Sequence, residues 1–203
     1  PTSDLEDVQK TIRASFEVSP TAEITMECNP GDVTAEKAAC WLESGVNRIS
    51  MGVQSFDDGL LSLLGRRHTA LEAKQAFHTL RDAGFRNQSI DLIYGLPYQS
   101  PEQWSHTLSE AIGLESDHIS LYSLQIEKGT PLAVDVATGK YPIPDDDLAA
   151  DMYEEAQRRL AENGFSQYEI SNWSKPNLES QHNLIYWLNE PYLGVGPGAH
   201  SWI

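Results

Sequence analysis

The chain has 203 residues, with 14 Lys or Arg and 30 Asp or Glu, which gives a formal net charge of −16 at pH 7. This length can bury a complete core, so one domain is the default, and the negative charge argues against nucleic acid or an anionic membrane as partner. No apolar run approaches the ~20 residues of a membrane-spanning helix, and the first residues lack a signal-peptide pattern, so we expect a cytoplasmic protein.

Four segments show the alternating apolar and polar side chains of β-strands, over residues 24–28, 49–54, 90–94 and 119–124. Helices between and after them are predicted from the N-cap residues Thr34, Thr69, Ser100 and Asp145. An apolar stripe formed by Leu5, Val8, Ile12 and Phe16 predicts one more helix ahead of the first strand. The segment after Gly164 is rich in aromatics and Asn, and we expect it to be irregular.

Each predicted strand has one apolar row of side chains and one row that is small or polar. The second row consists of Thr25, Glu27, Ser50, Gly52, Gln54, Asp91, Ile93, Ser120 and Tyr122. Strands of consecutive βα units are normally parallel and carry their sites at the C-terminal ends, so Glu27, Gln54 and Asp91 are predicted to meet at one mouth. Any one of them could instead cap a helix or a loop amide, but three equivalent positions favour a ligand site.

Other residues limit the chemistry. The two cysteines, Cys28 and Cys40, are too few for a disulfide framework and lack the closely spaced partners of a zinc or iron-sulfur site. No strand ends in Lys and no His pair lies at strand ends, which argues against a Schiff-base aldolase and a metal-dependent hydrolase. Arg66 has a bland interpretation as a solvated surface residue. In its functional interpretation the guanidinium binds a ligand carboxylate, or pairs with Glu27 or Asp91.

Six motifs together resemble a known family. They are ECNPG at 27–31, GVQSFD at 52–57, LGR at 64–66, IDLIYGLP at 90–97, YEISN at 168–172 and YLGVGPGAHS at 192–201. In this order they are similar to the radical S-adenosylmethionine proteins related to oxygen-independent coproporphyrinogen III oxidase. The chain looks most like the heme chaperone, HemW-type branch of that family, because His182-Asn183-Leu184-Ile185-Tyr186-Trp187 fits the HNxxYW signature associated with heme.

The resemblance implies an α/β fold, part of an open, TIM-like (β/α)6 radical-SAM barrel. In that family a [4Fe-4S] cluster binds S-adenosylmethionine and reduces it to a 5′-deoxyadenosyl radical. Carried over by motif, the cofactor contacts would be Glu27, Gln54, Arg66 and Asp91. Heme would contact His182, Tyr186 and Trp187, with His182 as ligand to the iron. The alternative for His182 is a structural histidine within an aromatic cluster.

The chain departs from the family in its cysteines. The CxxxCxxC loop that holds the cluster and a glycine-rich strand end are absent, so the sequence reads as a fragment preceded by two further βα units. Residues 1–140 would then be the barrel portion, and residues 141–203 the last helix of its layer and the start of the C-terminal region. We expect this chain alone to be inactive. A targeting peptide upstream would direct the protein to an organelle instead of the cytoplasm.

The function implied is that of a heme chaperone that passes heme to an acceptor protein, and the resemblance leaves a homodimer open. The first alternative is an oxygen-independent coproporphyrinogen III oxidase of porphyrin biosynthesis, which needs the absent cysteines and is expected to lack the HNxxYW signature. A barrel hydrolase is a third possibility, but the sequence has no recognisable nucleophile or metal set for it.

Overall fold

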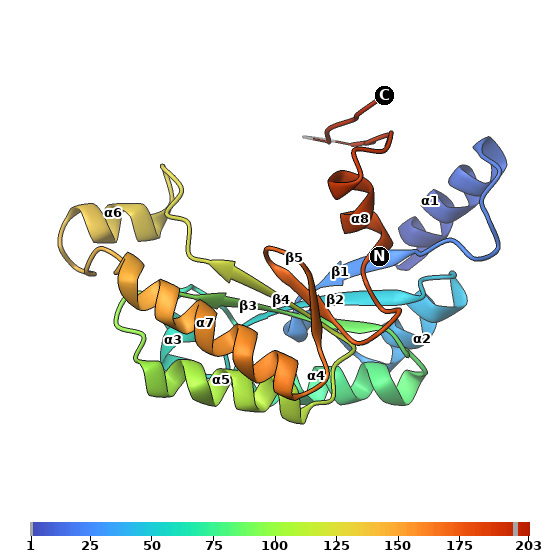
Figure 1. Ribbon diagram of the computed structural model, residues 1–203. Helices are drawn as coiled ribbons and strands as arrows, with labels where there is room; N and C mark the ends of the chain where they lie inside the picture. Colours follow the sequence, from blue (N-terminus) through green and yellow to red (C-terminus); the bar gives the residue numbers. More distant parts are fainter. Residues whose placement is uncertain (1, 197–198) are drawn as a thin grey trace.

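The computed structural model describes residues 2–196 and 199–203, and it shows an α/β fold built on one six-stranded sheet that does not close (Figure 1). The parallel strands are β1 (Thr25–Cys28), β2 (Arg48–Gln54), β3 (Gln88–Tyr94) and β4 (His118–Ser123). A hairpin of β5 (Ser166–Glu169) and β6 (Asn172–Ser174) continues the sheet, with β6 antiparallel to β4. The strand order is β1-β2-β3-β4-β6-β5.

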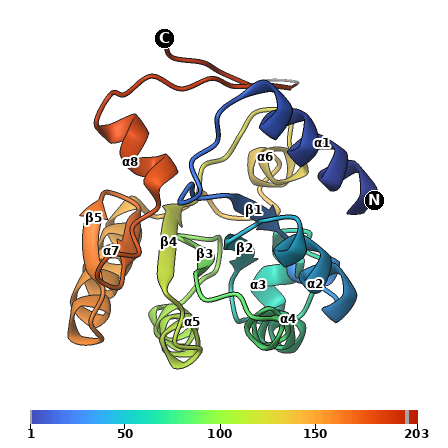
Figure 2. The same cartoon turned by 90° about the vertical axis from the view of Figure 1, so that its right-hand side faces the viewer.

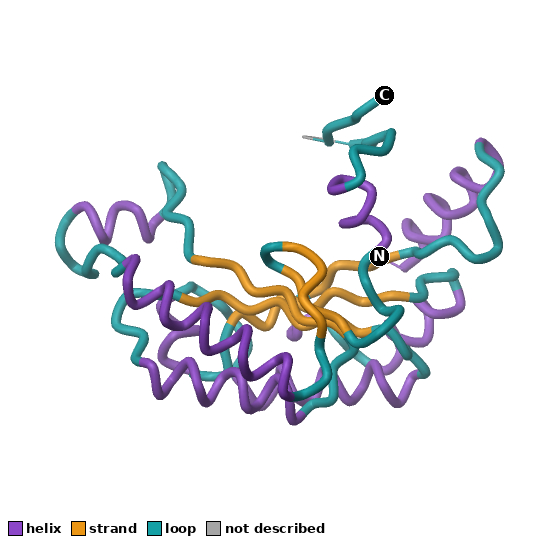
Figure 3. The backbone as a smooth tube through the Cα atoms, viewed as in Figure 1, coloured by secondary structure: helices purple, strands orange, loops and turns teal. Residues whose placement is uncertain are grey.

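The helices lie mainly on one side of the curved sheet. They are α1 (Thr2–Ser15), α2 (Ala35–Glu43), α3 (Asp58–Leu63), α4 (Ala70–Ala83), α5 (Pro101–Gly113), α6 (Pro131–Ala137), α7 (Asp146–Glu162) and α8 (Gln181–Trp187), with a 3-10 turn η1 (Pro30–Asp32). Figures 1 and 3 show α4, α5 and α7 beneath the sheet, and α6 and α8 above it. Viewed from the side in Figure 2, the sheet curves so that its upper face is concave.

The apolar strand row forms the core between the sheet and these helices, as the sequence predicts. Its central members are 0–1% exposed: Ile49, Met51, Ile90, Leu92, Ile119 and Leu121. On the helical side Trp104 is fully buried, and its Nε1 donates to the Met152 carbonyl at 2.7 Å, which joins α5 to α7. The polar row of the strands is therefore left on the concave face.

The predicted helix starts are confirmed in detail. The side chains of Thr34, Thr69, Ser100 and Asp145 each accept from a backbone N–H in the first turn of the following helix. Thr69 and Ser100 complete capping boxes with Glu72 and Gln103. Such caps satisfy backbone donors that the helix itself leaves free.

One expectation needs correction. The segment after Gly164 is not irregular: it forms the β5–β6 hairpin and α8, whose strands of four and three residues are too short to show a clear period. The helix predicted from the apolar stripe ahead of the first strand is present as α1, although Val8, Ile12 and Phe16 of that stripe are 53%, 40% and 57% exposed. Residues 197 and 198 of the YLGVGPGAHS motif lie outside the described residues.

Among the helices of residues 2–196 and 199–203, none combines the length and the apolar character needed to cross a bilayer.

Replacing Thr69 with Ala should lower the free energy of unfolding by about 1 kcal/mol, because the backbone N–H of Glu72 loses its side-chain acceptor. Thr79→Ala is the matched control in the same helix, since its hydroxyl only donates back to the Gln75 carbonyl. Urea denaturation of both variants measures the difference. Equal midpoints for the two variants would contradict the capping role of Thr69.

Candidate functional site

The side chains named from the strand ends lie together. Glu27, Gln54, Arg66 and Asp91 all line one hollow of about 330 Å³ on the concave face, which we call the strand-end hollow. Cys28, Asn29, Ser50 and Gly52 complete its lining. Because parallel strands end on the same side of the sheet, side chains from β1, β2 and β3 converge here with the loop that carries Arg66.

Asp91 is the most heavily hydrogen-bonded of these side chains. Both of its carboxylate oxygens accept from Ser50 Oγ, at 3.0 and 3.1 Å, and Oδ1 also lies 3.4 Å from Ser89 Oγ. Burial raises the pKa of Asp91, while hydrogen bonds from Ser120 and Ser50 and the charge of Arg48 act in the opposite direction. The result is a desolvated carboxyl group suited to hydrogen-bonding a polar ligand.

Gln54 ends β2 in an unusual backbone conformation. Its φ is +71°, and the β2–β3 register shifts between Gly52 and Gln54. A Cβ on Gly52 would lie 2.9 Å from Gln54 Nε2, so the side-chain amide rests directly over the glycine. Positive φ at a residue other than glycine stores strain, and such strain clusters at binding sites.

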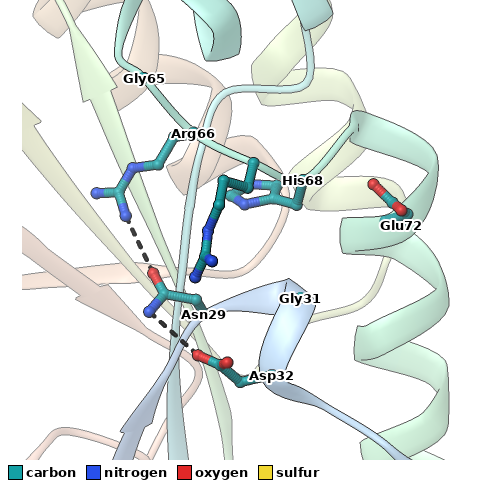
Figure 4. A pocket seen from close by; sticks show the side chains of 8 residues that line it. Asn29, Gly31, Asp32, Gly65, Arg66, His68 and Glu72 are labelled. Atoms are coloured by element: carbon teal, nitrogen blue, oxygen red, sulfur yellow. Dashed lines mark hydrogen bonds between the residues drawn. The ribbon is translucent and has the colours of Figure 1, made fainter.

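Arg66 belongs to a second hollow, of about 500 Å³, which we call the loop hollow (Figure 4). Its lining consists of Asn29, Gly31, Asp32, Gly65, Arg66, Arg67, His68 and Glu72. Arg66 Nη1 donates to Asn29 Oδ1 at 3.0 Å, and Asn29 Nδ2 lies 3.4 Å from Asp32 Oδ2. Among the described residues, Arg66 therefore contacts Asn29 and makes no ion pair with Glu27 or Asp91, contrary to one of the interpretations that the sequence left open.

A third hollow of about 630 Å³ extends from the middle of the strands toward their starts; we call it the central hollow. It shares Glu27, Ser50 and Asp91 with the strand-end hollow. Its remaining walls include Glu23, Arg48, Ser120 and Tyr122 from the sheet side, and Gln181, His182 and Asn183 from α8. The histidine of the HNxxYW signature thus faces the same concave surface as the carboxylates of the strand ends.

The aromatic residues of α8 are only partly gathered. The rings of His182 and Tyr186 are in edge contact with centroids 4.8 Å apart, and Tyr186 meets Tyr192 at 4.6 Å. Tyr186 and Trp187 are 48% and 57% exposed, and neither is among the described residues that line the central hollow. The structure therefore brings the rings of His182 and Tyr186 into contact, while both Tyr186 and Trp187 lie on the surface.

Sequence reasoning missed several residues of the site. Arg48 is 4% exposed, lies with its Nε 4.0 Å from Glu23 Oε2, and reaches the central hollow. Its position two residues before Ser50, on the same face of β2, was the available signal. Asn29 follows β1 inside the ECNPG motif, but only the folded loop shows that it accepts from Arg66.

The thiol of Cys28 is poorly suited to bind a metal. Cys28 packs against the core, and burial, with Asp91 and Asp32 nearby, raises the pKa of its thiol to about 12. A thiol with so high a pKa is a poor source of the thiolate that metals require. Among the described residues no group of three or more His, Cys, Asp and Glu side chains is arranged to bind a metal ion.

Comparisons with known proteins identify the family of this chain. Residues 1–111 match the family described as the radical SAM superfamily. The chain belongs to this superfamily. It is 39% identical over 199 residues to "Heme chaperone HemW" of Bacillus subtilis, which covers 98% of this chain and 52% of that protein. It is 44% identical over 180 residues to "Radical S-adenosyl methionine domain-containing protein 1, mitochondrial" of Mus musculus, covering 89% and 41%.

The fold of this radical SAM protein matches a solved structure as well. The structure titled "Coproporphyrinogen III oxidase (HemN) from Escherichia coli is a Radical SAM enzyme" superposes with a TM-score of 0.84 at 23% identity, over 100% of this chain and 49% of that one. At that identity the likeness shows the shared fold. The chain spans about half the length of the curated relatives it matches.

Replacing Asp91 with Asn should stabilise the protein at neutral pH. The folded-state pKa of Asp91 is raised, so the unfolded chain releases this proton at a lower pH than the folded protein does. Stability is therefore lost as the pH rises above the ordinary value of 3.8, and an uncharged isostere escapes that loss.

Thermal unfolding at several pH values measures this effect. The Asn variant should melt above the wild type at pH 7, and the difference should vanish toward pH 3. A lower melting temperature at pH 7 would show that the attraction of Arg48 outweighs the cost of burying the carboxylate.

Proposed function

We propose that this chain is part of a radical SAM heme chaperone, which binds heme beside α8 and hands it to an acceptor protein. The observation that carries this proposal is the position of His182, which faces the central hollow together with Glu27 and Asp91. Relatives near 40% identity that carry the name heme chaperone support it. In this proposal residues 1–140 are the barrel portion, and residues 141–203 supply the heme-associated part.

The strand-end hollow suits the polar groups of S-adenosylmethionine. The carboxylates of Glu27 and Asp91 can accept from ribose hydroxyls or an amino group, and the amide of Gln54 can donate or accept. The guanidinium of Arg66 can pair with the methionine carboxylate, for which its hydrogen bond to Asn29 orients it. When bound, this cofactor would supply the 5′-deoxyadenosyl group on which the chemistry of the superfamily rests.

The [4Fe-4S] cluster does not fit the residues of this chain. The sequence contains two cysteines, whereas three thiolates hold such a cluster in the family, and the Cys28 thiol is strongly disfavoured as a thiolate. We therefore assign the cluster to the remainder of the longer relatives and propose that the 203 residues alone do not cleave S-adenosylmethionine.

Heme would lie against His182 and Tyr186. A neutral imidazole can ligate iron, and the neighbouring tyrosine ring offers an apolar surface for the porphyrin. His182 is exposed, so a planar ligand can reach it without displacing the core. Trp187 would join the heme contact only if the ligand extends over the outer face of α8, where this side chain is exposed.

The second candidate is an oxygen-independent coproporphyrinogen III oxidase, favoured by the shared fold with the Escherichia coli enzyme. It predicts decarboxylation of coproporphyrinogen III by the protein carrying its cluster. A heme chaperone predicts stoichiometric heme transfer to an acceptor without that turnover, so the two assays separate the candidates. The cellular compartment of the protein depends on the organism it comes from, since its relatives include both a bacterial protein and a mitochondrial one.

Replacing His182 with Ala should weaken heme binding about tenfold or more, which corresponds to ~1.4 kcal/mol, and should shift the Soret band because the iron loses an axial ligand. His106→Ala is the matched control, since this histidine is 56% exposed on α5, on the opposite side of the sheet. Heme titration followed by absorbance measures both. An unchanged affinity and spectrum in the His182 variant would remove this residue from the site.

A further inference from the structure

A chain of hydrogen bonds connects the site carboxylate Asp91 with α8. Ser89 Oγ lies 3.4 Å from Asp91 Oδ1 and 2.8 Å from His118 Nδ1. His118 Nε2 lies 2.7 Å from the Tyr168 hydroxyl, which accepts from Asn183 Nδ2 at 3.2 Å. The contacts run from β3 through β4 and β5 into α8, across segments that are far apart in the sequence.

The chemistry of these groups determines which one donates and which one accepts in each hydrogen bond. A carboxylate only accepts, so Ser89 donates to Asp91 and accepts from the Nδ1–H of His118. A neutral imidazole carries one N–H, so its Nε2 accepts from the Tyr168 hydroxyl. His118 is fully buried and its pKa is lowered to about 3, mainly by burial, which keeps the ring neutral.

Helix α8 is held by a few polar contacts at its first turn, and Tyr168 supplies part of them. It contains seven residues, none of which is buried, and a helix this short is not stable by itself in water. Its first turn is held by polar contacts: the Tyr168 hydroxyl accepts from Ser180 N at 3.4 Å, and Glu23 accepts from Gln181 N at 3.2 Å and His182 N at 3.4 Å.

We propose that His118 and Tyr168 are positioning residues for His182: their hydrogen-bonded pair fixes the first turn of α8 above the central hollow. His118 orients the Tyr168 hydroxyl, and that hydroxyl receives the N–H groups of Ser180 and Asn183 on either side of His182. The effect of this pair on ligand binding rests on the proposed heme function. Its effect on the position of α8 does not depend on that function.

Tyr168→Phe removes the hydroxyl alone and should loosen α8. We expect amide hydrogen exchange over residues 180–187 to become about tenfold faster, because two hydrogen bonds to that turn are lost. Tyr153→Phe is the matched control: its hydroxyl donates to the Ile170 carbonyl at 2.9 Å and does not reach α8. The control should leave exchange over residues 180–187 unchanged.

Two amide variants of His118 separate its two contacts. The side-chain amide of Gln reaches the place of Nε2, so His118→Gln keeps an acceptor for Tyr168 and should retain protection of residues 180–187. The shorter Asn reaches only the place of Nδ1, so His118→Asn should behave like Tyr168→Phe. Unaltered protection of β3 in both variants verifies that the sheet is intact.

Heme binding is measured on the same proteins. If the wild type binds heme, Tyr168→Phe and His118→Asn should weaken heme binding, whereas His118→Gln should keep the wild-type affinity. A wild type that binds no heme would overturn the proposed function, and the exchange data would still decide the seating of α8. The positioning role is overturned if Tyr168→Phe leaves exchange over residues 180–187 unchanged, or if the Gln and Asn variants exchange alike.

Discussion

The alternation of side chains along four parallel strands controls the rest of the structure. One row of each strand is sealed beneath the helices, with Ile49, Ile90 and Ile119 fully buried, so the other row must occupy the concave face. That second row is small and polar, and the face consequently holds hollows lined by carboxylate, amide and hydroxyl groups in place of a packed interior. The same burial that stabilises the fold therefore fixes where a ligand can be held.

The concave face carries features that cost stability. Asp91 is a partly buried carboxyl group, Gln54 takes a positive φ, and Arg48 Nε has no hydrogen-bond partner among the described residues. Each is tolerated because the surrounding sheet is held by strong packing and by well-capped helices. Costs of this kind, gathered on one surface, are typical of a surface that binds a ligand.

The sequence predicted most of what depends on local pattern. Strand positions, helix caps and the convergence of Glu27, Gln54 and Asp91 follow from period, cap chemistry and parity. It could not predict what depends on distant contacts: the β5–β6 hairpin is defined by pairing with β4, and α8 is held by Tyr168 and Glu23 and not by an apolar face. The partner of Arg66 likewise depends on how two loops meet, and the roles of the site residues stay predictions.

The position of β1 at the rim of the sheet has a consequence for handling the protein. In the part of the chain that the structure describes, β1 pairs with β2 on one side only, so the backbone N–H and C=O groups along its outer margin are open to another strand. An unpaired edge strand of this type can form backbone hydrogen bonds with a strand of another molecule. The 203-residue chain should therefore self-associate through this margin as its concentration rises.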